Sequence, residues 1–197
     1  MPVLPGFRKG RSRPAPAGDT ALDAEADRLL AERVLAGDRQ ALAMLLDRHL
    51  GPVYRYLSAM FGPGNEQLVA EITRAVFRDA FTVRRLRPYA RGRVSTPMRS
   101  ALLRAANRQL AARRPASTVR VQATGPGDER AALRRAVLSL PARQRDALAL
   151  ALFENMAAEG LARTLGVGPA RAMRLLRGAL RRMDKLYSYG VRPERSP

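Results

Sequence analysis

Few side chains of this 197-residue chain have the chemistry for catalysis or for metal binding. There is no cysteine and a single histidine, His49, so thiol nucleophiles and metal sites built from His and Cys are excluded. A Ser-His-acid triad would depend on His49. This residue ends an apolar helical pattern just before Gly51-Pro52, and a positive imidazole is favourable at a helix C-terminus. We therefore expect a structural role for His49 and no enzymatic activity.

Two other patterns could bind small ligands. The carboxylates Asp23, Glu25 and Asp27 are closely spaced, but they fall in the first turns of an expected helix, where the helix dipole favours acids. A carboxylate metal site is the alternative. Gly166-Val167-Gly168 begins like a dinucleotide-binding fingerprint, yet Arg171 replaces its third glycine and no strand precedes it. We expect no metal and no cofactor.

The dominant chemical feature is an excess of arginine. The chain has 36 Lys and Arg against 17 Asp and Glu, a formal net charge of +19, and Lys9 and Lys185 are its only lysines. Arginine suits planar, bidentate contact with phosphate or guanine better than lysine does. Codon usage in a GC-rich genome would also raise the arginine fraction, but it does not explain the missing acids. The expected counter-surface is polyanionic, nucleic acid first and an anionic membrane second.

This charge is unevenly distributed along the chain. Residues 19–79 hold ten acids and seven basic side chains, a net charge of −3, whereas residues 80–127 hold eleven arginines and no acid. A solvated basic face normally has interspersed acids that limit self-repulsion, so we interpret the second segment as a surface that follows phosphates. Its arginines between residues 84 and 114 are Arg84, Arg85, Arg87, Arg91, Arg93, Arg99, Arg104, Arg108, Arg113 and Arg114. A second basic strip comprises Arg171, Arg174, Arg177, Arg181 and Arg182.

Helical periodicity accounts for most of the chain. It predicts helices over residues 20–36, 38–50, 52–61, 65–80 and 98–113, with Gly37-Asp38 as a helix stop and cap and a loop over 87–97. A second helical block over 129–188 is punctuated at Pro141, Gly160 and Gly178. No strand pattern of useful length occurs, so the fold class is all-α: two small helical domains joined by a flexible linker. The expected division is a disordered basic tail (1–18), a first domain (19–114), a linker (115–130), a second domain (131–188) and a tail (189–197).

The second block contains a short helix, a glycine turn and a longer helix. Gly166 can adopt the positive φ that such a turn needs, and Ala162 is small where the two helices would cross. Steps of three and four residues place several arginines of the basic strip on one side of the longer helix. This pattern is typical of a DNA-binding helix-turn-helix whose second helix lies in the major groove. A purely structural helical hairpin is the alternative.

Five segments taken together resemble bacterial RNA polymerase sigma factors of the small, two-domain extracytoplasmic-function (ECF) type. Residues 138–148 (LSLPARQRDAL) are similar to the opening of the family's fourth region, and residues 156–180 to the helix-turn-helix that reads the −35 promoter element. Residues 34–42 (VLAGDRQAL), 76–81 (VFRDAF) and 99–108 (RSALLRAANR) are similar to parts of its second region.

The resemblance implies a transcription-initiation subunit that binds core RNA polymerase and promoter DNA, with an anti-sigma protein as a further candidate partner. The first domain would dock on core polymerase through Glu66, Glu71, Arg74, Phe77 and Arg78. It would recognise and open the −10 element through Arg84, Arg85, Arg87, Tyr89, Arg91, Arg93, Arg99, Arg104 and Arg108. The second domain would bind the −35 element through Arg163, Gly168, Arg171, Arg174, Arg177 and Arg181.

The sequence departs from the family pattern in three places. Arg74 and Ala75 stand where Gln and Glu are usual in the docking segment, and Ala101 replaces an aromatic residue. Residues 170–176 (ARAMRLL) keep few of the usual side chains of the recognition helix. The nearest aromatic candidates for stacking on unpaired bases are Tyr89 and Phe81.

These departures leave two other interpretations open. One is a helix-turn-helix transcriptional regulator with an unrelated first domain. The other is a degenerate sigma-like module that binds a protein partner without reading DNA.

The sequence gives no indication of a membrane segment. Its longest apolar run, residues 147–153, is far shorter than the about 20 residues of a membrane helix. Residues 1–17 lack the apolar stretch of a signal peptide. We therefore expect no membrane insertion and a cytoplasmic location.

Overall fold

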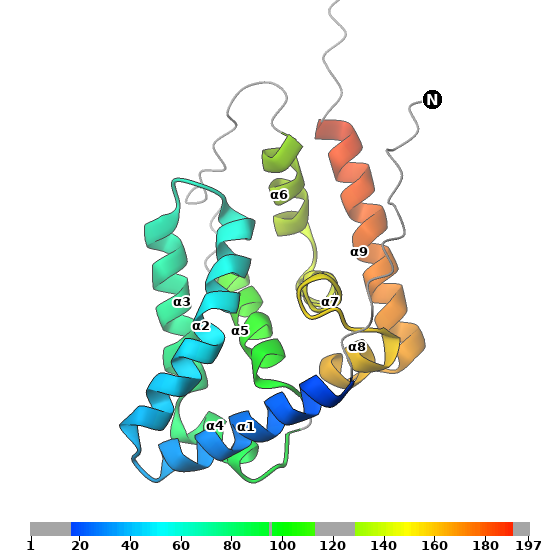
Figure 1. Cartoon of the computed structure of the whole chain (residues 1–197). Coiled ribbons are helices and arrows are strands. Elements are labelled where there is room, and N and C mark those ends of the chain that lie inside the picture. Colours follow the sequence, from blue (N-terminus) through cyan, green and yellow to red (C-terminus); the bar gives the residue numbers. More distant parts are fainter. Residues whose placement is uncertain (1–16, 95, 113–128, 191–197) are drawn as a thin grey trace, which may run out of the picture.

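The computed structural model describes residues 17–94, 96–112 and 129–190, and all regular secondary structure in these ranges is α-helical (Figure 1). The all-α prediction is therefore confirmed for this part of the chain, where no helix is both long enough and apolar enough to cross a membrane. The helices are α1 (Ala17–Leu35), α2 (Arg39–Phe61), α3 (Glu66–Ala80), α4 (Val83–Ala90), α5 (Met98–Ala112), α6 (Glu129–Ser139), α7 (Ala142–Phe153), α8 (Ala158–Leu165) and α9 (Pro169–Gly190). Nearly all of the predicted tails and linker, with Arg113 and Arg114, lies outside the described residues.

The first helix boundary follows directly from local sequence. Gly37 has a φ of 91°, in the left-handed region that favours glycine. The Asp38 carboxylate accepts hydrogen bonds from the backbone N–H groups of Gln40 (2.8 Å) and Ala41 (3.1 Å). Such a cap satisfies N–H groups that have no partner inside the helix. The predicted stop and cap at Gly37-Asp38 are confirmed.

The predicted break at Gly51-Pro52 is wrong, because α2 continues through it to Phe61. A proline inside a helix removes one hydrogen bond and costs about 3 kcal/mol. Burial on both sides of Pro52 opposes this cost: Leu45 and His49 before it, and Val53 and Leu57 after it, lie on one buried face. Since the helix does not end there, the predicted end-of-helix role of His49 is also wrong.

The predicted helices omit α4, and the predicted loop over residues 87–97 begins too early because α4 extends to Ala90. Leu86 and Ala90 are one helical turn apart and both are buried, which anchors α4 on α1. Two glycines that were expected to interrupt helices lie inside them. At Gly178 of α9 a Cβ atom would come within 2.9 Å of Gln144 Nε2 of α7, so glycine leaves room there for the end of the Gln144 side chain.

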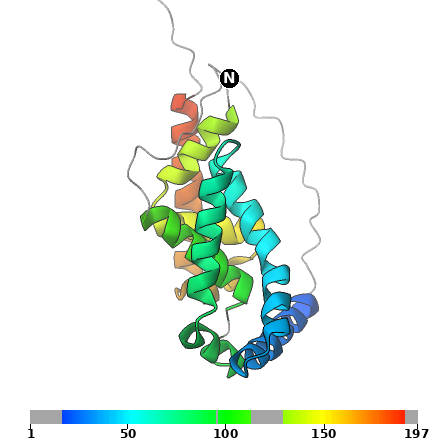
Figure 2. The same ribbon diagram turned by 90° about the vertical axis from the view of Figure 1, so that its left-hand side faces the viewer.

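One apolar core joins the two halves of the described chain, α1–α5 and α6–α9. Val137, Leu140 and Leu148 of the second half belong to the same buried cluster as Leu57 and Leu102 of the first. α5 packs on α7 and α2 packs on α6 (Figures 1 and 2). The halves therefore lie packed against each other, and the division into two domains stays a prediction.

The acids at the start of α1 pair with arginines. Asp27 is buried, its Oδ1 atom lies 3.0 Å from both His49 Nε2 and Arg48 Nε, and Asp23 also pairs with Arg48. Glu25 pairs with Arg28 on its own helix. Within the described ranges, no cluster of three His, Cys, Asp or Glu could hold a metal ion. Asp23 and Asp27 therefore tie α1 to α2.

Candidate nucleic-acid interface

A short turn fixes α9 against α8. Gly166 adopts φ 65° and ψ 42°, and the Val167 N–H donates a hydrogen bond to the Ala162 carbonyl oxygen at 3.0 Å. A left-handed glycine with this bond is the Schellman type of helix ending. Leu161 and Ala162 are buried together with Ala172 of α9 in a small apolar cluster. The turn and this cluster set the position of α9 relative to α8.

α9 has one buried face and one basic face. Ala172 and Ala179 are fully buried, and Leu176 packs partly against the core. The arginines predicted for the −35 side are all exposed, as is Gly168: Arg163, Arg171, Arg174, Arg177 and Arg181. The ion pairs among the described residues all lie elsewhere. These guanidinium groups therefore face solvent and can meet an anionic partner.

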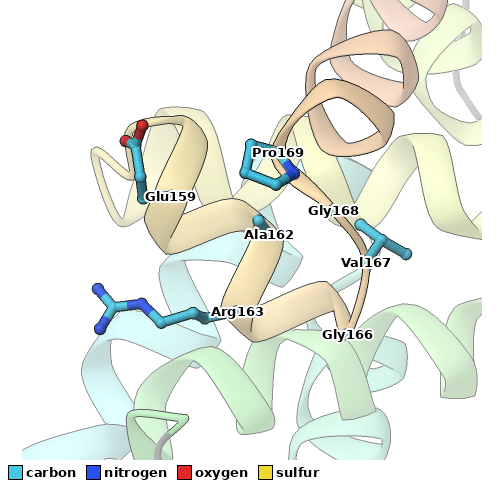
Figure 3. Close-up of a pocket in the computed structure, with 7 residues that line it drawn as sticks. All are labelled: Glu159, Ala162, Arg163, Gly166, Val167, Gly168 and Pro169. Atoms are coloured by element: carbon cyan, nitrogen blue, oxygen red, sulfur yellow. The ribbon is translucent and has the colours of Figure 1, made fainter.

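An open hollow of about 600 Å³ lies beside the turn (Figure 3). Ala162 and the stretch from Gly166 to Pro169 line it, together with Glu159 and Arg163, whose side chains extend outward from α8 in Figure 3. A Cβ atom added at Gly166 or Gly168 would have no neighbour within 4 Å. These small residues leave room for a partner to approach the N-terminus of α9 closely.

The basic residues of α4 and the segment after it form a second exposed set. Arg84, Arg85, Arg87, Arg91 and Arg93 are exposed. Among the described residues, Arg85 is the member of this set that has an acidic partner: its Nη2 atom lies 3.7 Å from Asp79 Oδ2. The predicted arginines from 84 to 93 all face solvent, and we call this set the α4 surface.

The aromatic candidates for base stacking lie nearer the core. Tyr89 is half-buried, and this burial, with the nearby charge of Asp27, raises the pKa of its phenol to about 12. Phe81 packs edge-on against Phe77, with ring centroids 5.3 Å apart. Both rings therefore already contact protein, and only part of each surface is left for a base.

The α5 arginines have a different environment, because they face the second half of the chain. Arg99 Nε lies 2.8 and 2.9 Å from the two carboxylate oxygens of Glu154, just after α7. Arg104 Nη1 donates a hydrogen bond to the Thr164 carbonyl oxygen of α8 at 2.6 Å. Arg108 is exposed. Arg99 and Arg104 therefore have partners in the second half of the chain, although the Arg99 side chain stays 45% exposed and Arg104 is half-buried.

A buried chain of hydrogen bonds runs beside these contacts. The Tyr56 hydroxyl donates to Asn107 Oδ1 at 2.5 Å, and Asn107 Nδ2 donates to Asp146 Oδ1 at 2.7 Å. Asp146 Oδ2 lies 3.8 Å from Arg104 Nε. Because buried polar groups are costly when unpaired, this chain specifies how α5 meets α7.

The carboxyl groups of Asp146 and Glu154, which lie where α5 meets the second half, both have raised pKa values. Burial raises the pKa of Asp146, although its hydrogen bond with Asn107 and the charges of Arg104 and Arg108 oppose the rise. Burial also raises the pKa of Glu154, against the effect of Arg99. Each acid therefore binds a proton more readily in this structure than it does in water.

The predicted polymerase-docking residues of α3 fall into two groups. Glu66, Glu71, Arg74 and Arg78 are exposed. Phe77 is buried in the main core, so its side chain is available for packing inside the protein and not for a partner.

Comparison of the sequence with known proteins finds no matching protein-family model and no curated protein that is significantly similar.

Sequence reasoning did not single out Tyr56, Asn107, Asp146 or Glu154 as parts of one site. The available signal was polar residues at positions of the helical pattern where a buried side chain is expected, above all Asn107, which is 1% exposed. That signal marks a buried polar residue, but it does not name a partner 39 residues away.

We predict that Gly166→Ala lowers the free energy of unfolding by about 1 kcal/mol, because a side chain at a positive φ is strained. Gly168→Ala is the matched control, since Gly168 is not in that region and its Cβ would also meet open space. The control should change stability by less than about 0.5 kcal/mol. Urea denaturation of both variants measures the difference, and equal effects would contradict the role of Gly166.

The raised pKa of Asp146 predicts a pH dependence of stability. A carboxyl with a raised folded-state pKa contributes stability that is fully present below its ordinary pKa and is lost as the pH rises through the raised value. The Asp146→Asn variant has no carboxyl at this position, so it should not lose this stability. The free energy of unfolding of the wild type should therefore fall relative to that of the variant as the pH rises from 4 towards neutrality.

Urea midpoints at a series of pH values test this prediction. The exposed Asp47 provides the control variant Asp47→Asn. A stability difference between the wild type and Asp146→Asn that stays constant with pH would overturn the assignment.

Proposed function

We propose that this protein is a divergent ECF-type sigma factor that binds core RNA polymerase and directs promoter recognition. The observation that carries the proposal is a pair of separate, exposed arginine surfaces on α4 and on α9. The α9 surface belongs to a segment that resembles the family's helix-turn-helix, and the α4 surface lies between two segments, residues 76–81 and 99–108, that resemble parts of its second region. Arginines with few acidic neighbours favour a phosphate backbone as partner.

The second part of the proposal concerns the turn between α8 and α9. The left-handed Gly166, the buried Ala162 and the exposed Arg171 and Arg174 are the features that a DNA-reading helix-turn-helix requires. In this proposal α9 enters the major groove with its first turns nearest the bases. Phosphate contacts from the rest of the basic face orient it.

The third part is docking on the polymerase. The exposed face of α3 carries Glu66, Glu71, Arg74 and Arg78. This part of the chain has a slight excess of acid, in contrast to the arginine-rich segment that follows it. We propose that the α3 face binds core polymerase while the arginine surfaces bind DNA.

A transcription assay tests the function as a whole. We expect the full chain to co-purify with bacterial core polymerase and to support initiation in vitro from members of a genomic promoter library. Substitution of both Glu71 and Arg74 by Ala should weaken co-purification and leave DNA binding by the isolated chain unchanged.

The outcomes separate the interpretations. No association with core polymerase would refute the sigma-factor proposal and favour a helix-turn-helix regulator. Association without initiation from any promoter would favour the degenerate, protein-binding module.

DNA binding by α9 is tested by its salt dependence. Replacing Arg171 or Arg174 by Ala should weaken binding and reduce the magnitude of the log–log salt slope by about 1 per lost phosphate contact. Arg39→Ala, an exposed arginine at the start of α2, is the control that should leave the slope unchanged. Fluorescence anisotropy with a labelled duplex measures both. Equal slopes for all three variants would exclude α9 as the DNA-binding surface.

A further inference from the structure

The turn between α7 and α8 is held by side-chain contacts at two positions. The Glu154 carboxylate accepts a hydrogen bond from Arg99 Nε at 2.9 Å. Two residues later, the Met156 sulfur accepts a hydrogen bond from the Thr164 hydroxyl at 3.6 Å. Between these two positions, Asn155 adopts a φ of 49°, in the left-handed region that non-glycine residues seldom occupy. The Met156 sulfur therefore helps to fix where α8 begins.

Met156 also contacts the small apolar cluster that holds α8 against α9. The buried members of this cluster include Leu161 and Ala162 of α8 and Ala172 of α9, and the Met156 side chain packs against them. Thr164, whose hydroxyl contacts the sulfur, is itself only 4% exposed. Because this cluster has few members compared with the main core, the loss of one contact removes a large share of the packing between α8 and α9.

The thioether of Met156 is accessible to a small oxidant, because this residue is half-buried. The chain contains no cysteine, so all its sulfur atoms belong to methionines. Met60 and Met98 are buried in the main core, whereas Met44 on α2 is 47% exposed. Of the methionines that the structure describes, Met156 is the one that packs against the α8–α9 cluster.

We propose that Met156 is a site of reversible oxidation by hydrogen peroxide, and that its sulfoxide weakens the attachment of α8 to α9. The thioether sulfur attacks one peroxide oxygen, so that an S–O bond forms, the O–O bond breaks and the sulfur loses two electrons. The second oxygen leaves with the electron pair of the O–O bond and takes up the proton of the transferred oxygen, which gives water. A methionine sulfoxide reductase reverses the change.

The sulfoxide changes the packing because it adds a polar oxygen in apolar surroundings. Such a group costs free energy unless it is hydrogen-bonded, and a close-packed cluster accommodates an extra atom only by moving. The Thr164 hydroxyl can bond the new oxygen only by changing its contact with the sulfur. α8 then packs less closely on α9, which loosens the N-terminus of α9. The effect on DNA binding rests on the proposed function, whereas the effect on stability does not.

The test compares protein before and after treatment with hydrogen peroxide, with peptide mass spectrometry to identify the oxidised methionines. Fluorescence anisotropy with a short labelled duplex measures DNA affinity, and urea denaturation measures stability. We expect both to fall in the treated wild type, the affinity several-fold, and to recover after incubation with methionine sulfoxide reductase. Met156→Leu should keep both after treatment. Met44→Leu is the matched control and should respond as the wild type does, since Met44 is exposed on α2.

Two further variants test the same site from other directions. The triple variant Met44→Leu, Met173→Leu, Met183→Leu keeps Met156 and removes the other exposed or half-buried methionines of the described chain, so it should stay sensitive to peroxide. Met156→Gln places a polar group in the cluster without oxidation, and it should weaken DNA binding and stability in untreated protein. Circular dichroism verifies that the helices of each variant are intact.

An equal response of Met156→Leu and the wild type to peroxide would overturn the proposal, as would a fall in affinity and stability while Met156 stays unoxidised. Failure of the proposed function is distinguishable. In that case the untreated protein would bind neither the duplex nor core polymerase, but oxidation would still lower the urea midpoint of the wild type and not that of Met156→Leu.

Discussion

The described structure depends on which arginines its scarce acids pair with. Each buried or half-buried acid determines which arginines are held by the protein. Asp27 holds Arg48 and contacts His49, which ties α1 to α2, and Glu154 holds Arg99, which ties the second half to α5. Among the described residues, the basic face of α9 lies outside every ion pair.

α5 makes contacts with both halves of the described chain. Its buried face carries Leu102, Leu103 and Asn107, and its polar face carries arginines that contact α7 and α8. Apolar packing makes α5 part of the core of the first half, whereas its charged and amide groups connect it to the second. A helix in this position therefore belongs to the packing of both halves.

Local features of the sequence predicted the helical class, the cap at Asp38 and the turn glycine at Gly166, since each depends on a few neighbouring residues. The predicted break at Pro52 failed because long-range burial of Val53 and Leu57 outweighed a local preference. The predicted arginine clusters could not reveal that Arg99 would meet Glu154, 55 residues later in the chain. A basic sequence pattern predicts that an arginine has an anionic partner. Only the tertiary structure determines whether that partner is an acid of the same chain or another molecule.

The uninterrupted course of α2 has a mechanical consequence. Its 23 residues correspond to a rod of roughly 34 Å, at 1.5 Å per residue. Near its middle, His49 contacts α1, and at its C-terminal end Gly62 lies directly beneath the Arg134 guanidinium of α6. A break at Pro52 would have let these two contacts move independently. Because the rod is continuous, one helix carries both contacts, so the N-terminal helix and the second half of the chain are geometrically linked although they are far apart in sequence.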